Sequence, residues 1–211
     1  MRLVGLVLIA LLSALPTKAQ DKAGAFDYYL LALSWSPGWC ALTGDARDDP
    51  QCDAGRGLTF TVHGLWPQYE TGYPKDCFAT KADPSRADTE AMTDIMGGAG
   101  LAFYQWRKHG RCSGLSARAY FATLRRAHAS ITIPPIFARV DRDLILSATV
   151  IEAAFLAANP ALSADQVTIT CKSRKIQEVR LCLTRDLHPR SCAADVARDC
   201  SLPDAELDAV R

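Results

Sequence analysis

The chain has 211 residues, of which 49% are hydrophobic, and its mean hydropathy is close to zero. This length suits one domain, and the apolar content excludes a chain that is disordered throughout. The 24 Lys and Arg residues nearly balance the 23 Asp and Glu residues, so the sequence is not that of a protein that holds nucleic acid by long-range positive charge.

The first nineteen residues have the pattern of a secretory signal peptide. Arg2 precedes an apolar run over residues 3–12, and small residues occupy the exit positions of Thr17-Lys18-Ala19. The alternative, a membrane anchor, needs about 20 apolar residues, more than this run supplies. We therefore expect residues 20–211 to form a secreted or periplasmic domain without membrane attachment.

Cleavage near Ala19 changes the charge balance slightly. Loss of Arg2 and Lys18 leaves 22 basic residues against 23 acidic ones, a net charge of −1. A polyanionic substrate would then be held by local contacts. This favours a degrading enzyme over a stable coat or repressor.

All eight cysteines follow the expected signal peptide. An even number of cysteines in a secreted chain predicts disulfide bonds. A zinc site, the alternative, would have close pairs such as Cys-x-x-Cys, and none is present. The spacing by itself leaves the pairing open. The cysteines are Cys40, Cys52, Cys77, Cys112, Cys171, Cys182, Cys192 and Cys200.

The first half of the domain contains two predicted strands. Residues 28–35 (YYLLALSW) form an apolar and aromatic run typical of a buried strand, which stops at a Ser-Pro-Gly turn. Residues 41–57 are polar and predict a surface loop. Residues 58–63 (LTFTVH) alternate and predict a second strand, ended by residues 64–67 (GLWP).

Helices follow, and a second pair of strands closes the sequence. Helical patterns cover residues 85–96, 101–109, 117–129 and part of 143–158. Residues 167–171 and 176–183 predict a β-hairpin, and the tail from Asp186 is expected to be irregular. These elements together predict a single α+β domain, with an antiparallel sheet packed against several helices and stabilised by disulfides.

Two segments carry residues suited to catalysis. In residues 60–68 (FTVHGLWPQ), His63 ends a strand and a glycine follows it. In residues 104–112 (YQWRKHGRC), Gln105 and His109 lie four positions apart, on one face of a helix. Each segment also has an ordinary explanation, because isolated histidines are often structural and basic helix ends are often only solvated.

Taken together, these segments strongly resemble the ribonuclease T2 family. The resemblance rests on residues 31–37 (LALSWSP), 60–68 and 106–112, in the same order and spacing, and extends to the last cysteine. It implies an α+β fold and endonucleolytic cleavage of single-stranded RNA through a 2′,3′-cyclic phosphate. It also implies no metal or other cofactor, no action on DNA, and work outside the cytosol. We expect a monomer.

The resemblance also suggests roles for individual residues. His109 is expected to be the general base and His63 the general acid, although the sequence cannot order the two. Lys108 would offset negative charge on the phosphate. Trp66 would support the histidine site or stack on a base, with core packing equally favoured. Tyr73 offers another stacking face, although an ordinary structural role is the favoured interpretation for it.

The second segment departs from the family pattern at two positions. Gln105 stands where the family usually has Glu, and Tyr104 where it often has a second His. An amide can orient a histidine but adds no charge to it, whereas Tyr104 can still donate a hydrogen bond to phosphate. The alternative function is therefore a secreted binding or inhibitory protein of this fold with weak catalysis. His128 and His188 lie in no matching motif.

The resemblance further suggests how the cysteines pair. Cys77 is expected to bond Cys112, which would connect the loop after the first segment to the end of the second. The remaining expected pairs are Cys171–Cys200, Cys182–Cys192 and Cys40–Cys52.

Overall fold

The computed structural model describes residues 21–78 and 81–211. The predicted signal peptide at residues 1–19 lies outside the described residues. Within the described ranges, no helix combines the length and the apolar character that crossing a bilayer requires.

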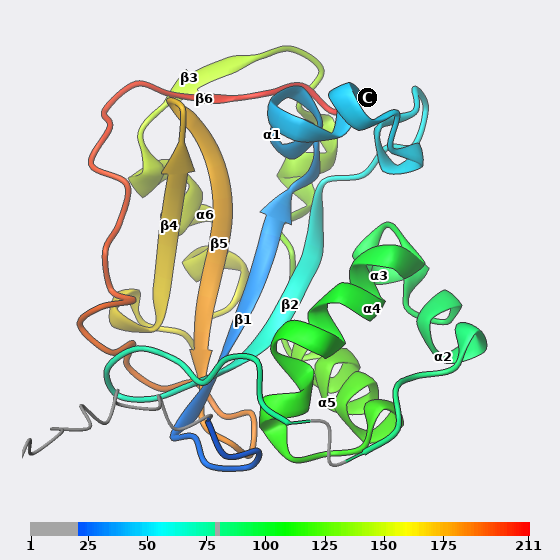
Figure 1. Ribbon diagram of the computed structural model, residues 1–211. Helices are drawn as coiled ribbons and strands as arrows, with labels where there is room; N and C mark the ends of the chain where they lie inside the picture. Colours follow the sequence, from blue (N-terminus) through cyan, green and yellow to red (C-terminus); the bar gives the residue numbers. More distant parts are fainter. Residues whose placement is uncertain (1–20, 79–80) are drawn as a thin grey trace, which may run out of the picture.

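The centre of the molecule is a single sheet (Figure 1). Its strands follow the order β2-β1-β5-β6-β3, and β4 also pairs with β5. The strands predicted at residues 28–35, 167–171 and 176–183 are confirmed to within one residue, the last two as an antiparallel hairpin. The strands are β1 (Tyr28–Trp35), β2 (Phe60–Gln68), β3 (Leu144–Leu146), β4 (Val167–Lys172), β5 (Lys175–Leu183) and β6 (Ala205–Leu207).

Two features of the sheet differ from the prediction. The tail after Asp186 is not wholly irregular, because it contains β6. The β6 strand pairs parallel to β5, with Lys175 opposite Glu206, so the sheet is mixed rather than wholly antiparallel. Three residues are too few to show an alternating pattern. This strand forms because β3 and the end of β5 offer it free edges.

The helices form two groups along the sheet. In Figure 1, α2 to α5 lie together beside β2, whereas α6 packs near β4. The helix predicted at 117–129 is confirmed as α5, but residues 85–96 divide into two short helices. The helices are α2 (Arg86–Glu90), α3 (Thr93–Met96), α4 (Ala99–Lys108), α5 (Ala117–Ala129) and α6 (Ala148–Ala158).

Residues 36–52 were predicted as a turn and a surface loop, and this was wrong. They form α1 (Ser36–Trp39) and three short helical turns, Cys40–Gly44, Asp45–Arg47 and Pro50–Cys52. Prolines near the starts of the first and last of these segments favour helical backbone angles. Further short helical turns are Gly110–Ser113, Pro135–Arg139 and Ala164–Gln166.

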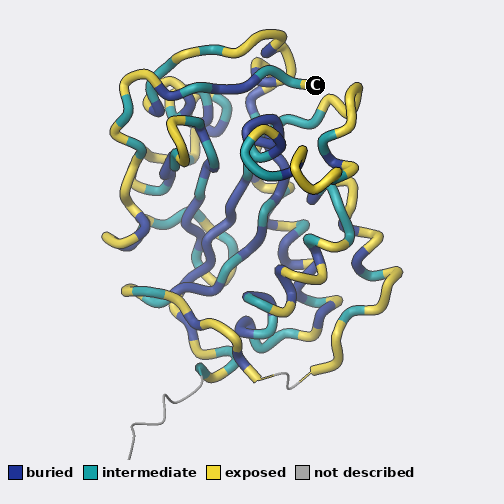
Figure 2. The backbone as a smooth tube through the Cα atoms, turned by 45° about the horizontal axis from the view of Figure 1, so that its top comes forward, coloured by how far each residue is buried: buried dark blue, intermediate teal, exposed yellow. Residues whose placement is uncertain are grey.

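The main core lies on one face of the sheet. Leu31, Leu33 and Trp35 alternate along β1 and are fully buried there, together with residues of α5 and α6. Figure 2 shows the buried backbone following the central strands, with exposed backbone around the periphery. On the opposite face of β1, Ala32 and Ser34 have small side chains, so that face has room for groups from the neighbouring strands.

The β2 strand is longer than predicted and contains a bulge. The sequence suggested that it ends at His63, but it continues to Gln68. Leu33 pairs with Val62 and Ala32 with Gly64, so His63 is an extra residue between these two pairs. Because of this bulge, Val62 and Leu65 both face the core. The buried Tyr120 hydroxyl of α5 donates a hydrogen bond to the Leu65 carbonyl at 2.9 Å and anchors the extension.

All four expected disulfides are confirmed. The described cysteines include no free thiol. The Cα atoms of each pair are 5.2–5.4 Å apart, within the usual range. The bonds are Cys40–Cys52, Cys77–Cys112, Cys171–Cys200 and Cys182–Cys192.

Candidate active site

The face of the sheet opposite the main core carries His63. Its side chain is 32% exposed, and its Nδ1 lies 2.5 Å from the Glu178 Oε1 of β5. His63 lies on β2 and Glu178 on β5, on either side of β1. The usual spacing of neighbouring strands therefore separates β2 from β5 by about 10 Å. The contact can form across β1 because β1 places Ala32 and Ser34 opposite Gly64 and Glu178 on this face.

Trp66 contacts both candidate histidines. The centroid of its ring is 5.1 Å from that of His63, at an interplanar angle of 78°, and 5.1 Å from that of His109, at 31°. The two imidazoles are therefore no farther apart than twice this distance. The structure thus brings histidines that are 46 positions apart in the sequence into contact with the same indole.

His109 follows α4 and is buried, with 6% of its surface exposed. Its backbone N–H donates to the Gln105 carbonyl, which completes the last helical turn. Burial, with smaller effects from Lys108 and His63, lowers the pKa of His109 from 6.5 to about 3. This imidazole is therefore uncharged at neutral pH.

Gln105 interacts with Trp66 through its side chain. Its Oε1 accepts a hydrogen bond from the Trp66 Nε1–H at 2.8 Å, and the Gln105 residue is 1% exposed. This amide therefore holds the indole that both histidines contact. The contact requires a glycine at position 64, because a Cβ there would lie 2.3 Å from the Trp66 Nε1 and 2.6 Å from the Gln105 Oε1.

Tyr104 lines two hollows. The first, of about 790 Å³, is lined by His63 and Tyr104, and the second, of about 590 Å³, by Tyr104, Lys108 and Arg107. The Lys108 Nζ lies 5.5 Å from the centre of the Tyr104 ring, whose residue is 52% exposed. Tyr104 therefore lines both hollows, with Lys108 in one and His63 in the other.

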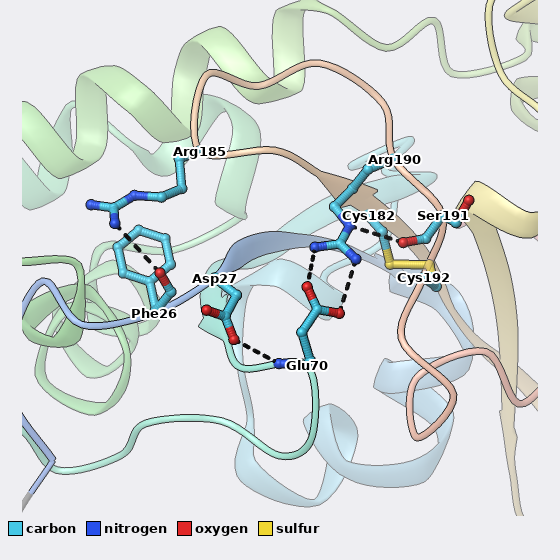
Figure 3. Close-up of polar contacts among 8 residues, drawn as sticks. All are labelled: Phe26, Asp27, Glu70, Cys182, Arg185, Arg190, Ser191 and Cys192. Atoms are coloured by element: carbon cyan, nitrogen blue, oxygen red, sulfur yellow. Dashed lines mark hydrogen bonds and ion pairs between the residues drawn. A yellow bond between two sulfur atoms is a disulfide. The ribbon is translucent and has the colours of Figure 1, made fainter.

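Tyr73 packs beside His109, with their ring centroids 6.1 Å apart. It lies in the loop after β2, which Glu70 helps to hold in place. Figure 3 shows the bidentate ion pair between Arg190 and Glu70, at 2.7 and 3.0 Å, and the Glu70 N–H donating to Asp27. The Cys77–Cys112 disulfide fixes the other end of this loop. Tyr73 therefore helps to cover His109 from a loop tied at both ends.

A family model adds independent evidence. The model described as "Ribonuclease T2 family" matches residues 26–192. The chain belongs to the ribonuclease T2 family. The match spans both histidine segments and all the disulfides except the one to Cys200.

Curated relatives of this chain are named ribonucleases. A "Ribonuclease" of Aeromonas hydrophila is 44% identical over 114 residues, which are 54% of this chain and 50% of that protein. A "Probable ribonuclease" of Haemophilus influenzae is 32% identical over 127 residues, 54% of this chain and 47% of that protein. This chain thus spans about half the length of the curated relatives it matches.

Solved structures support the T2 fold. Trichomaglin, described as a novel S-like ribonuclease, has a TM-score of 0.67 at 20% identity, covering 88% of this chain and 98% of that one. The RNase-related protein from Calystegia sepium has a TM-score of 0.65 at 20% identity, covering 88% and 97%. At this identity the likeness concerns the fold.

Glu178 and Arg180 of this T2 family member were not predicted as site residues from the sequence. Both lie on β5, and the Arg180 Nε and Nη2 each lie 2.8 Å from the second Glu178 carboxylate oxygen, Oε2. A signal was available. In the strand KIQEVRLCL, two charged residues alternate with apolar ones in the middle of a buried strand, and such charges are rare unless they are paired.

Two further histidines and one cluster of carboxylates lie elsewhere in the fold. His128 lies on α5 and His188 in the loop after β5, and neither contacts His63 or His109 in any described interaction. Among the described residues, one cluster of three carboxylates has its oxygens close enough to one another to hold a cation. It consists of Asp143, Glu206 and Asp208. The Lys175 ammonium already lies 2.7 Å from Glu206 and 2.6 Å from Asp208.

Proposed function

We propose that this protein is a metal-independent endoribonuclease that cleaves single-stranded RNA by transphosphorylation to a 2′,3′-cyclic phosphate. One observation carries the proposal. His63 and His109 contact the same indole in unlike environments, the first hydrogen-bonded to a carboxylate and the second buried. Paired titratable groups in contrasting surroundings are how one site supplies an acid and a base at the same pH.

His109 is the general base in this proposal. A base must start the reaction without its proton, and burial keeps the His109 imidazole neutral. An anionic phosphodiester beside it would oppose the effect of the Lys108 charge and raise the basicity of the ring. His109 then removes the proton from the ribose 2′-OH.

His63 is the general acid. In this role His63 starts the reaction with a hydrogen on each ring nitrogen, and the Glu178 Oε1 accepts a hydrogen bond from its Nδ1–H. The 2′-oxygen bonds to phosphorus while the bond from phosphorus to the 5′-oxygen breaks. His63 gives its proton to that leaving oxygen, so the products are a cyclic phosphate and a free 5′-OH.

The surrounding residues stabilise charge and orient the substrate. Lys108 offsets the negative charge that develops on the pentacoordinate phosphorus. Tyr104, exposed beside Lys108, donates a hydrogen bond to a phosphate oxygen. The Trp66 ring is in contact with both histidines and with Gln105, which favours a supporting role for it over stacking on a base. Tyr73, 47% exposed, offers the stacking face.

We also propose that the protein works outside the cytosol as a single chain. Four disulfides in a domain of this size are typical of oxidising compartments. A secreted or periplasmic location would follow from cleavage near Ala19.

The first prediction tests the reaction. Protein lacking residues 1–19 is incubated with single-stranded RNA in EDTA between pH 4 and 8. We expect fragments ending in 2′,3′-cyclic phosphate and no cleavage of DNA, which has no 2′-OH to attack. His63→Ala and His109→Ala should each lower kcat by about 10²–10⁴-fold, the usual contribution of a general acid or base. Product ends are identified by mass spectrometry.

His128→Ala is the matched control, because His128 lies on α5 away from the site and should retain full activity. Loss of cleavage in EDTA with recovery in Mg²⁺ would overturn the metal-independent mechanism. Tight RNA binding without cleavage would instead favour the alternative, a binding or inhibitory protein in which Gln105 has replaced a working carboxylate.

A further inference from the structure

Glu178 is buried in the middle of the sheet between two nitrogen-bearing side chains. One carboxylate oxygen lies 2.5 Å from the His63 Nδ1, and the other lies 2.8 Å from the Arg180 Nε. The Glu178 side chain is 1% exposed. Its contacts therefore decide whether it can carry a charge, because an unpaired buried carboxylate would take up a proton.

The charge state of Glu178 fixes the direction of the hydrogen bond to His63. Burial raises the pKa of the Glu178 carboxyl, but the hydrogen bonds and charges of His63 and Arg180 outweigh it, and the net effect lowers this pKa. An ionised carboxylate has no proton to donate. The Nδ1 of His63 must therefore carry the hydrogen, which leaves Nε2 as the atom available to a substrate.

Arg180 has a second contact that connects this pair to the site. Its guanidinium carbon lies 5.6 Å from the centre of the Trp66 ring, and its side chain is 28% exposed. The guanidinium thus offsets the Glu178 charge from the side opposite His63. With Arg180 present, His63 experiences only part of the attraction of the carboxylate.

We infer that Glu178 and Arg180 are positioning residues that hold His63 with its hydrogen on Nδ1 and jointly set the pH range over which His63 can deliver a proton. The Glu178 carboxylate attracts the positive charge that the ring carries when it holds both hydrogens, and the Arg180 guanidinium offsets part of that attraction. This inference rests on the proposed role of His63 as the general acid. Neither residue touches the substrate in this scheme.

Other charged groups face His63 from several elements. They remain unchanged when Glu178 or Arg180 is substituted, so they do not account for a difference between the two variants. Lys172 of β4 lines a small cavity together with His63 and Glu178. Arg47 and Asp49 line the 790 Å³ hollow with His63. His109 contacts the same Trp66 ring as His63.

The test compares two charge-removing variants. Glu178→Gln should move the alkaline limb of the profile of kcat/KM against pH to lower pH, and lower kcat/KM at pH 7 by about 10- to 100-fold, mainly through kcat. Arg180→Gln should move the same limb to higher pH. Opposite shifts are the expected signature, because general damage to the site would lower the rate without moving the limb in two directions.

Glu206→Gln is the matched control, since Glu206 is a carboxylate paired with Lys175 on the neighbouring strand and touches neither histidine. It should leave the profile unchanged. Shifts of the Glu178 and Arg180 variants in the same direction, or no shift in either, would overturn the inference.

A spectroscopic measurement keeps the inference testable if a variant fails to fold or the protein does not cleave RNA. The ¹⁵N NMR shifts of the His63 ring in the unsubstituted protein report which nitrogen holds the hydrogen in the neutral ring. We expect Nδ1–H. Finding Nε2–H would refute the positioning role, while absence of RNA cleavage with Nδ1–H present would count against the proposed function only.

Discussion

Gln105 occupies a position that links the two halves of the site. It is almost fully buried, it accepts the Trp66 N–H, and it lies one helical turn before His109. A carboxylate in this place could accept the same hydrogen bond and would also place a negative charge near the buried imidazole. The choice of amide therefore affects the basicity of His109 more than the geometry of Trp66.

The second prediction follows from this position. Gln105→Glu should raise the pKa of His109, because an added carboxylate stabilises its protonated form. If the base is limiting, kcat/KM should rise by about tenfold, the effect of roughly one pKa unit. Steady-state cleavage of a dinucleotide substrate measures it. An unchanged or lower rate in a folded variant would show that the amide is not the limiting feature.

At the scale of a single element, the bulge in β2 places the catalytic candidates. In a regular strand, side chains alternate between the two faces of the sheet. Without the bulge, alternation from Val62 would put Leu65 on the face away from the core and Trp66 on the core face. Bulges commonly redirect side chains beside active sites. Here the bulge lets His63 and Trp66 share a face while Leu65 stays in the core.

The third prediction concerns Gly64, beside the bulge. Gly64→Ala should destabilise the protein by about 1–3 kcal/mol, because the new methyl group overlaps the Trp66 indole and the Gln105 amide. It should also lower activity, since Trp66 must move. Gly100→Ala is the control, because its Cβ would meet nothing within 4 Å in α4, and alanine favours helix. Chemical denaturation gives the free energy of unfolding of both variants.

At the scale of the whole molecule, the buried histidine makes stability depend on pH. The native pKa of His109 is about 3, whereas an unfolded histidine titrates near 6.5. Between these values the unfolded chain binds a proton that the native protein does not, so stability falls as the pH falls. Burial also lowers the pKa of His128, which acts in the same direction.

The fourth prediction quantifies this dependence. From pH 6.5 to pH 5, the free energy of unfolding should fall by about 1.6 kcal/mol through His109, because the slope rises from about half of 1.4 kcal/mol per pH unit at pH 6.5 towards that full value at pH 5. His109→Gln should remove the part of this pH dependence that comes from His109. His128→Gln should remove only the part that comes from His128. Urea unfolding at the two pH values measures the difference. Equal pH dependence in the His109 variant and the unsubstituted protein would contradict the burial of an uncharged ring.

The sequence by itself determined β1, α5, the β4–β5 hairpin and the two histidine segments. Each of these depends on periodicity, turn residues or a short motif, all of which act over a few neighbouring positions. Resemblance to the T2 family added the disulfide pairs. The short strands β3 and β6 were not predicted, because they form by pairing with strand edges that come from distant parts of the sequence.

Only the tertiary structure decided how the histidines differ. The bulge at His63 depends on pairing with β1, and the contact with Glu178 depends on the small side chains that separate two strands. The burial of His109 depends on Trp66 and Tyr73, which come from other segments. The charge on an imidazole is set by the solvent and charges around it in space, and a linear sequence does not specify these until it folds.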